Sequence, residues 1–114
     1  MESCVFCRIA SREIPARIVL DEPDLMAFED LNPQAPVHIL LIPKKHVPTT
    51  LALSADDDPL VGRLIRAAAR LARERSVAED GYRLVVNTNP AAGQSVYHLH
   101  VHLLGGRGMT WPPG

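Results

Sequence analysis

Three of the five histidines alternate along one segment near the C-terminus. Alternate side chains of an extended strand lie on the same face, so His98, His100 and His102 are expected to present three imidazoles on one side. The opposite face then carries apolar residues that we expect in the core, namely Leu99, Val101 and Leu103. An open sheet face with merely structural polar residues would use Thr, Ser or Lys as readily, so the pattern favours chemistry.

Two kinds of chemistry suit such a row of imidazoles. Three histidines can ligate a catalytic metal ion such as zinc. Alternatively, the middle ring, His100, acts as a nucleophile while its neighbours handle charge and protons. An unperturbed imidazole titrates at about pH 6.5, so the row can contain neutral and protonated rings together. A neutral ring that attacks, beside rings that donate to phosphoryl oxygens, would suit a reaction at phosphorus.

The segment 87–95, just before the histidines, is rich in small and amide residues and contains no carboxylate. Its glycine, Gly93, lets backbone N–H groups approach an anion closely, and Gln94 and Ser95 add donors beside His98. Metal ligands usually have carboxylates as partners for their second nitrogen. Donors without acids therefore favour a phosphate ligand, although a plain turn accounts for the same composition.

The two cysteines, Cys4 and Cys7, have the C-x-x-C spacing of zinc ligands, and a tetrahedral site would need two further ligands. A redox role would require a thioredoxin-like βαβ context, which the surrounding sequence lacks. Two reduced cysteines near the surface are the remaining alternative. Two cysteines do not make the disulfide framework of a small secreted protein.

Length and composition limit the possible classes of protein. A chain of 114 residues is expected to form one domain, residues 1–114. Its net charge of −1 argues against a nucleic-acid binder. Residues 84–106 contain no Asp, Glu, Lys or Arg, but their amides and three histidines exclude a membrane span. Residues 1–10 contain no apolar run typical of a signal peptide, so we expect a cytoplasmic protein.

Proline and glycine divide the chain into short strands around one long helix. Strands are expected at residues 17–20 and 24–28, as a hairpin around Glu22-Pro23, and at 37–42, 82–87 and 98–104. Apolar residues at helical spacing from Leu60 to Ala72 predict a helix between the third and fourth strands, with Pro59 in its first turn. We interpret the arginines on its other face as a solvated surface. The pattern predicts a mostly antiparallel sheet of about five strands with one main helix on one face.

The segment 94–106, QSVYHLHVHLLGG, resembles the motif of the histidine triad (HIT) family. The resemblance extends over nearly the whole chain, through CVFCRIASREIPARIV, AFEDLNPQAPVHILLIPKKHV, GYRLVVN and the terminal WPPG. The motif and the WPPG end look more like the histidine triad nucleotide-binding branch, the purine nucleoside phosphoramidases, than like the dinucleoside polyphosphate hydrolases. The resemblance implies an α+β fold: a five-stranded, mostly antiparallel sheet with one long helix and a short N-terminal helix, paired into a symmetric homodimer.

The resemblance also implies a reaction on a purine nucleoside 5′-phosphoramidate or a related mixed phosphoanhydride. His100 would attack the α-phosphorus and form a nucleotidyl-histidine that water hydrolyses, with His102 on the phosphate oxygens and His38 supporting His100 from behind. The other expected nucleotide contacts are Gly93, Gln94 and Ser95 at the phosphate or leaving group, Asn87 near the phosphate or ribose, Asp30 on the ribose hydroxyls, and Phe6, Ile9, Phe28 and Leu31 around the base. By residue type alone, Asp30 could equally be a turn acid, and His38 and the phenylalanines ordinary core residues.

Members of this family with an N-terminal C-x-x-C often bind a structural zinc, and the ligands that fit here are Cys4, Cys7, His46 and His98. Zinc in this position would hold the N-terminus, and His98 could then not serve as a free acid–base group of the catalytic set. No organic cofactor is expected. Three alternatives stay open: a nucleotide-binding interaction protein without catalysis, a dinucleoside polyphosphate hydrolase, and an enzyme with zinc on the triad itself. The wide spacing of the outer rings makes the last of these difficult.

Overall fold

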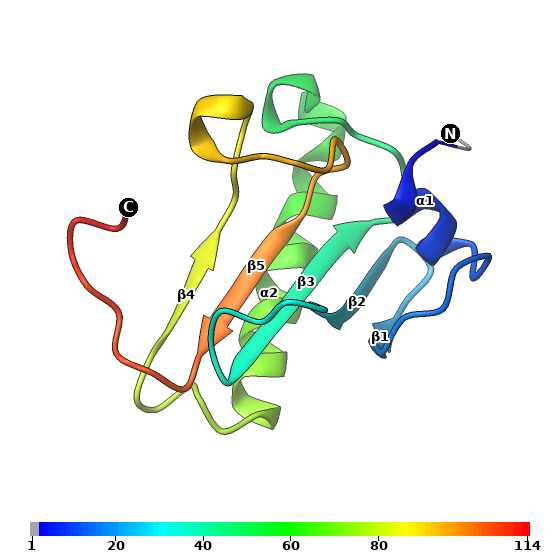
Figure 1. Cartoon of the computed structure of the whole chain (residues 1–114). Coiled ribbons are helices and arrows are strands. Elements are labelled where there is room, and N and C mark those ends of the chain that lie inside the picture. Colours follow the sequence, from blue (N-terminus) through cyan, green and yellow to red (C-terminus); the bar gives the residue numbers. More distant parts are fainter. Residues whose placement is uncertain (1–2) are drawn as a thin grey trace.

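The computed structural model describes residues 3–114 and contains a five-stranded antiparallel sheet (Figure 1). The strands are β1 (Ile18–Asp21), β2 (Leu25–Glu29), β3 (Val37–Pro43), β4 (Tyr82–Val85) and β5 (Val101–Gly105), in the spatial order β1-β2-β3-β5-β4. The predicted sheet is therefore confirmed, and all four pairings are antiparallel. Met1 and Glu2, which belong to the segment examined for a signal peptide, lie outside the described residues.

The histidine-bearing strand is shorter than the sequence predicts. β5 begins at Val101, and residues 96–100 form an irregular segment that leads into it. The Leu99 N–H donates to the Val47 carbonyl at 2.7 Å, so the loop after β3 holds this segment. Of the three alternating histidines only His102 lies in the sheet, where it is paired with Leu40 of β3.

The central strand β3 is buried along its whole length and contributes to both faces of the sheet. Its side chains alternate, so Val37, Ile39 and Leu41 face one core while Leu40 and Ile42 face another. The buried His38 falls in the same alternation as Leu40 and Ile42, on the face opposite the long helix. The centre of the sheet therefore carries a buried histidine, His38, on the face opposite the long helix.

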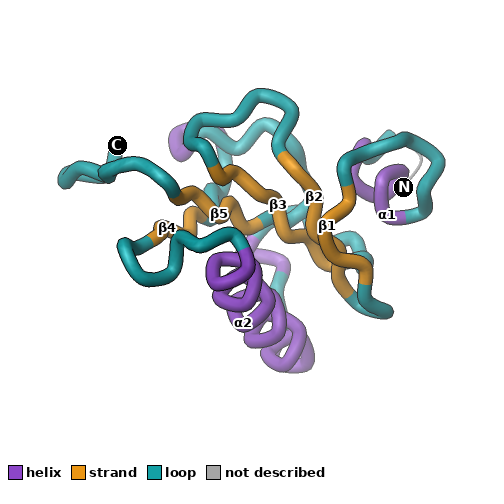
Figure 2. Tube along the Cα trace, turned by 90° about the horizontal axis from the view of Figure 1, so that it is seen from below, coloured by secondary structure: helices purple, strands orange, loops and turns teal. Residues whose placement is uncertain are grey.

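Helix α2 (Asp58–Glu74) covers one face of the sheet (Figure 2). It begins close to the predicted start, with Pro59 in its first turn. Its buried stripe packs against β3 and β5 and consists of Leu60, Leu64, Ala67, Ala68, Leu71 and Ala72. On the outer face Arg63 pairs with Asp24 and Arg70 with Glu22, which fixes the helix to the β1–β2 turn.

Helix α1 (Val5–Ala10) is the expected short N-terminal helix and lies beside β1 and β2 (Figure 2). Phe6 and Ile9 of α1 form a second core with apolar residues of β2 and β3: Met26, Phe28, Leu40 and Ile42. Three single-turn 3₁₀ helices complete the structure, at Thr50–Ala52, Ala55–Asp57 and Pro90–Ala92. Within residues 3–114 no helix has the length and apolar character that crossing a membrane would require.

Candidate active site

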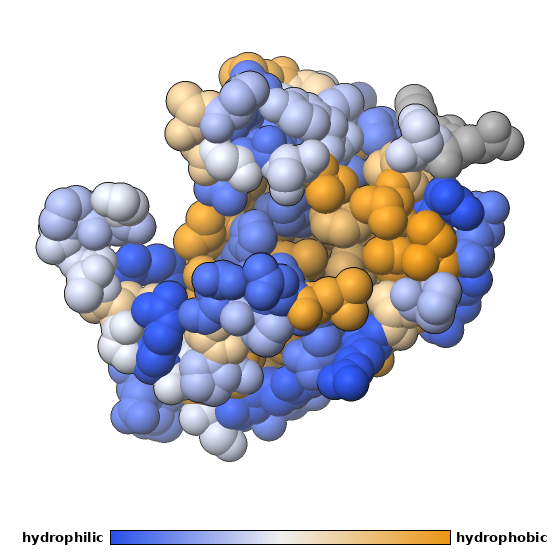
Figure 3. All heavy atoms as spheres, in the orientation of Figure 1, coloured by the Kyte–Doolittle hydropathy of each residue, from blue (hydrophilic) through white to orange (hydrophobic). Residues whose placement is uncertain are grey.

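A cavity of about 300 Å³ lies between α1, the end of β2 and the segment that precedes β5. Apolar side chains gather around α1 on this face of the molecule (Figure 3). The predicted wall residues all line the cavity, together with four of the polar residues expected to act there: Phe6, Ile9, Phe28, Leu31, Asp30, Ser95, His100 and His102. A mostly apolar cavity with a few convergent polar groups is the usual form of a small-molecule site.

The hydrogen bonds of His100 fix which of its ring nitrogens is free. Its Nδ1 lies 2.8 Å from the carbonyl oxygen of His98, and a carbonyl only accepts, so Nδ1 carries the proton. In the neutral ring Nε2 is then left with a lone pair. Phe6 packs edge-on against the ring, with centroids 5.1 Å apart, and His100 lines the cavity. His100 can thus act as a nucleophile through Nε2.

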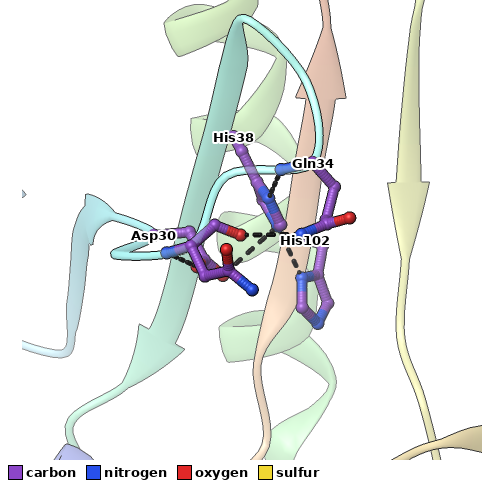
Figure 4. Close-up of polar contacts among 5 residues, drawn as sticks. Asp30, Gln34, His38 and His102 are labelled. Carbon is purple, nitrogen blue, oxygen red and sulfur yellow. Dashed lines mark hydrogen bonds and ion pairs between the residues drawn. The ribbon is translucent and has the colours of Figure 1, made fainter.

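His38 and His102 form a hydrogen-bonded pair next to His100 (Figure 4). The backbone N–H of Gln34 donates to His38 Nδ1 at 3.0 Å, so the proton of the neutral His38 ring sits on Nε2. His38 Nε2 lies 2.9 Å from His102 Nδ1 and donates to it. His102 therefore carries its own proton on Nε2 and can offer an N–H donor to a ligand in the cavity.

The expectation that His38 supports His100 needs correction, because the hydrogen bond of His38 is to His102. The strand register explains the difference. Leu40 is paired with His102 and His38 with Leu104, so His38 meets the β5 histidine and not the one that precedes the strand. His38 can influence His100 only through His102, whose ring centroid lies 4.9 Å from that of His100.

Asp30, His38 and His102 are close enough together to resemble a metal-binding group. The Asp30 Oδ2 lies 3.4 Å from His38 Nε2, and its Oδ1 accepts the Asn32 N–H at 2.8 Å. A metal on this group would need a lone pair on His38 Nε2, but the Gln34 N–H already requires the proton there. The contacts are those of a hydrogen-bonded network instead of a metal site.

Both rings of the His38–His102 pair are kept neutral by their surroundings. Burial lowers the pKa of His102 to about 4, with the neighbouring His100 and His38 rings acting in the same direction and Asp30 opposing them. Burial also lowers the pKa of His38, again against the Asp30 carboxylate. The hydrogen bonds from Gln34 to His38 and from His38 to His102 require both rings to be uncharged.

The residues expected to bind zinc form a separate cluster next to α1. Cys4 Sγ lies 3.3 Å from His98 Nδ1, while Cys7 Sγ lies 3.3 Å from His46 Nδ1 and 3.4 Å from His98 Nδ1. His98 Nε2 donates to the Pro43 carbonyl at 2.7 Å, which leaves Nδ1 with its lone pair toward the cysteines. This cluster of Cys4, Cys7, His46 and His98 could hold a metal ion, as the four predicted ligands do come together.

The sequence suggests His98 both as a triad member and as a metal ligand, and its contacts match those of the ligand. Its ring is completely buried, and both nitrogens are directed to the Pro43 carbonyl and the cysteines. The zinc-on-triad alternative also fails within residues 3–114, because each triad ring directs its Nδ1 to a different partner: a thiol, a carbonyl and another histidine. His100 and His102 remain as the triad members of the cavity.

Three residues predicted to contact the nucleotide are not among those lining the cavity: Asn87, Gly93 and Gln94. Gln94 is buried and has a structural role, because its Oε1 accepts the Asn89 N–H and its Nε2 donates to the carbonyls of Pro48 and Val96. The Gly93 N–H donates to the Pro90 carbonyl and is occupied within its turn. From this loop only Ser95 and Val96 line the cavity.

Sequence reasoning missed several residues of the cavity and its support. Val5 and Leu40 line it, and their spacing to Ile9 on the helix and to His38 on the strand is a periodic signal that could have found them. Ile14, Pro15 and Ala16 also line the cavity from an irregular segment. Gln34 acts through its backbone N–H, which residue type does not reveal.

The fold and the row of histidines can be compared with known proteins. Residues 11–109 match the HIT domain, and the chain belongs to the histidine triad (HIT) family. It is 50% identical over 106 residues to the purine nucleoside phosphoramidase of Escherichia coli strain K12, covering 93% of this chain and 89% of the relative.

Two further relatives cover nearly the whole chain. An uncharacterized HIT-like protein of Synechococcus elongatus is 50% identical over 113 residues, which are 99% of this chain and 98% of the relative. The crystal structure of a HIT family hydrolase from Legionella pneumophila Philadelphia 1 has a TM-score of 0.97 and 51% identity, covering 98% of this chain and 100% of that one. The similarity therefore includes both helices and all five strands described above.

Proposed function

We propose that the protein is a hydrolase that cleaves the P–N bond of purine nucleoside 5′-phosphoramidates through a covalent nucleotidyl-His100 intermediate. The observation that carries the proposal is the tautomer of His100, whose proton lies on Nδ1 and whose Nε2 is free beside a cavity. The similarity to the E. coli purine nucleoside phosphoramidase supports the substrate class.

The reaction follows from the donors and lone pairs in the cavity. His100 Nε2 forms a bond to the α-phosphorus as the P–N bond breaks, and the leaving nitrogen takes a proton from solvent water and departs as an amine. His102 donates its Nε2–H to the phosphoryl oxygens, on which charge develops in the transition state. The Ser95 hydroxyl, which lines the same cavity, is placed to contact the phosphate or the leaving group. Water then attacks phosphorus and loses a proton to solvent, the P–His100 bond breaks with its electron pair returning to Nε2, and the nucleoside monophosphate leaves.

The rest of the nucleotide fits the remaining walls. Asp30, at the end of β2, offers a carboxylate that can accept from the ribose hydroxyls. Phe6, Ile9, Phe28 and Leu31 provide apolar surface for a planar base. Leu31 is 93% exposed, so packing against a base would remove its apolar surface from water.

Replacing His100 by Ala tests the proposal. Turnover of adenosine 5′-phosphoramidate should fall by several orders of magnitude, since a covalent mechanism loses its nucleophile. Mass spectrometry of the wild-type protein quenched during turnover should detect a chain heavier by one nucleotidyl group. AMP binding without turnover in the wild-type protein would instead indicate a nucleotide-binding interaction protein, and faster cleavage of a diadenosine polyphosphate would indicate the other hydrolase branch.

We further propose that the cluster of Cys4, Cys7, His46 and His98 binds a structural zinc ion. Two thiolates and two imidazoles are a donor set that zinc prefers, and the donor separations of 3.3–3.4 Å fit the edge of a small tetrahedron. Burial and the neighbouring Cys4 raise the pKa of Cys7 to about 11, so a cation is needed to hold its thiolate. The ion would attach α1 to the segment before β5 and would have a structural role only.

We also propose that two copies form the expected homodimer in the cytoplasm. β4 is an edge strand, and exposed apolar residues lie on or near it and α2, including Val86 (40% exposed) and Ile65 (42%). A second copy could cover the edge and this apolar surface. Sedimentation equilibrium of the wild-type protein and of Ile65→Asp tests the pairing: a monomeric wild-type protein would contradict it. Cell fractionation tests the location.

A further inference from the structure

Arg107, two residues beyond β5, is connected to the His38–His102 pair through the β2–β3 loop (residues 30–36). Its Nε donates to the Gln34 carbonyl at 2.9 Å, and the N–H of the same Gln34 donates to His38 Nδ1 at 3.0 Å. His38 in turn donates to His102 at 2.9 Å. Arg107 and His102 belong to the same continuous segment, which includes β5. This segment and the three hydrogen bonds therefore form a closed ring.

The β2–β3 loop is held at its start by the Asp30 N–H, which donates to the His38 carbonyl at 3.0 Å, and at Gln34 by this ring. Two hydrogen bonds of the loop are internal to it, from Asn32 N–H to Asp30 Oδ1 and from Gln34 Nε2 to the Asn32 carbonyl. Residues 31–34 are exposed. Outside contact comes from the segment after β5, where Gly106 approaches Pro36 so closely that a Cβ on the glycine would lie 2.9 Å from the proline Cβ. Arg107 adds the polar contact next to this close approach.

The backbone N–H of Gln34 at His38 Nδ1, and the Asp30 carboxylate 3.4 Å from His38 Nε2, both favour the observed direction of the histidine hydrogen bonds. An N–H can only donate, so it keeps the lone pair of His38 on Nδ1 and the proton on Nε2. If Gln34 moved away, His38 could carry its proton on Nδ1 and accept from His102. His102 would then have its proton on Nδ1 and a lone pair on Nε2, and it could no longer donate to a phosphoryl oxygen.

We propose that Arg107 is a positioning residue that sets the tautomers of His38 and His102 by holding the Gln34 peptide in place. The guanidinium is itself restrained, because its Nη1 donates to the Gly108 carbonyl at 3.0 Å. The functional part of this inference rests on the proposed hydrolase mechanism, which gives His102 Nε2–H its role, whereas the tautomers themselves do not depend on any reaction.

Nitrogen-15 NMR of the histidine side chains measures the tautomers directly, since protonated and lone-pair nitrogens resonate in separate regions. In the wild-type protein we expect a lone pair on Nδ1 of both His38 and His102. Arg107→Ala should shift both rings toward a mixture of tautomers, and Arg107→Lys, which keeps a cationic donor, should recover part of the wild-type pattern. Arg83→Ala is the matched control, because Arg83 donates to the Thr110 carbonyl at 3.0 Å and holds the same C-terminal segment without contacting the loop.

The kinetic consequence is a second readout. Arg107→Ala should lower kcat on adenosine 5′-phosphoramidate by about two- to tenfold, the range one hydrogen bond contributes, with little change in KM. Arg83→Ala should leave the histidine spectra unchanged. Unchanged His38 and His102 nitrogens in Arg107→Ala would overturn the proposal, as would a proton on Nδ1 of His38 in the wild-type protein. A wild-type protein with the expected tautomers and no phosphoramidase turnover would contradict the proposed function alone.

Discussion

Phe6 stands edge-on to His100, with ring centroids 5.1 Å apart and planes at 89°, and in the sequence it lies between Cys4 and Cys7. The N-cap and first turn of α1 thus carry the two thiols of the candidate metal cluster beside a wall of the cavity. Phe6 also packs against Phe28, with centroids 5.4 Å apart. The short N-terminal helix is therefore a shared part of two sites whose chemistry is separate.

Phe6→Leu should weaken substrate binding without removing the nucleophile. The substitution keeps an apolar side chain but loses the aromatic contacts, which contribute about 0.5–1.5 kcal/mol per pair. We expect KM for adenosine 5′-phosphoramidate to rise about two- to tenfold, while bound metal stays at the wild-type level. Steady-state kinetics and elemental analysis check both parts. An unchanged KM would mean that Phe6 is a core residue with no share in binding.

Removing the proposed zinc ion should lower the thermal stability of the protein. The cluster connects α1 to residues 46 and 98, so losing an ion there frees the N-terminus from the rest of the chain. We expect a strong chelator to lower Tm by about 10 °C, the shift that roughly 2 kcal/mol produces in a small domain. A double variant, Cys4→Ser with Cys7→Ser, is the control and should show the lower Tm without responding to chelation. One zinc ion per chain is expected by elemental analysis.

The stability of the protein should fall as the pH is lowered from neutral toward 4. The pKa of His102 is about 4 in the folded chain because of burial, against about 6.5 for a free imidazole, so the unfolded state binds its proton first. The neutral His102 ring therefore makes its full contribution to the free energy of unfolding above about pH 6.5. This contribution is lost progressively as the pH falls to about 4. Urea unfolding at several pH values checks this.

His102→Asn isolates that contribution, since an amide does not titrate in this range. The difference in unfolding free energy between the wild-type protein and the variant should shrink from about pH 6.5 down to about pH 4, the window given by the two pKa values. If the difference stayed constant with pH, the pKa of His102 would not be lowered in the folded protein.

Gly105→Ala should destabilise the end of β5. A Cβ at this position would lie 2.9 Å from both Cβ and Cγ2 of the buried Val77. We expect a loss of about 1–3 kcal/mol by urea unfolding, the usual cost of overpacking a core. Combining it with Val77→Ala should cost less than the sum of the single changes, by about 0.5 kcal/mol or more. Gly108→Ala, where a Cβ would meet no atom within 4 Å, is the control.

The patterns of the sequence predict the sheet and the long helix correctly, and several of the predicted site residues line one cavity. The apolar run of residues 37–42 matches β3, because that strand is buried on both faces, and the helical spacing from Leu60 to Ala72 matches α2, which is buried on one face. The histidine alternation suggested a strand that starts at His98, and β5 starts at Val101. The Leu99 N–H bonds to the Val47 carbonyl across the chain, and such a tertiary contact leaves no periodic trace in the sequence.

The site was harder to predict wherever backbone atoms form the decisive hydrogen bonds. Residue type suggested that Gln94 contacts a ligand, whereas its side chain satisfies three backbone groups of its own surroundings. The tautomers of His38 and His100 depend on one peptide N–H and one carbonyl, which every residue possesses. The tertiary structure decides which of these groups faces an imidazole.

The apolar character of the cavity walls has a consequence for the range of substrates. Phe6, Ile9, Phe28 and Leu31 offer no side-chain donor or acceptor to a heterocycle, and apolar walls discriminate only weakly between compounds of similar shape. Adenine, guanine and modified ring systems of the same size should be accepted with comparable ease. Specificity among cellular compounds should then come from contacts to the sugar hydroxyls and the phosphorus centre. The enzyme should discriminate little between nucleobases.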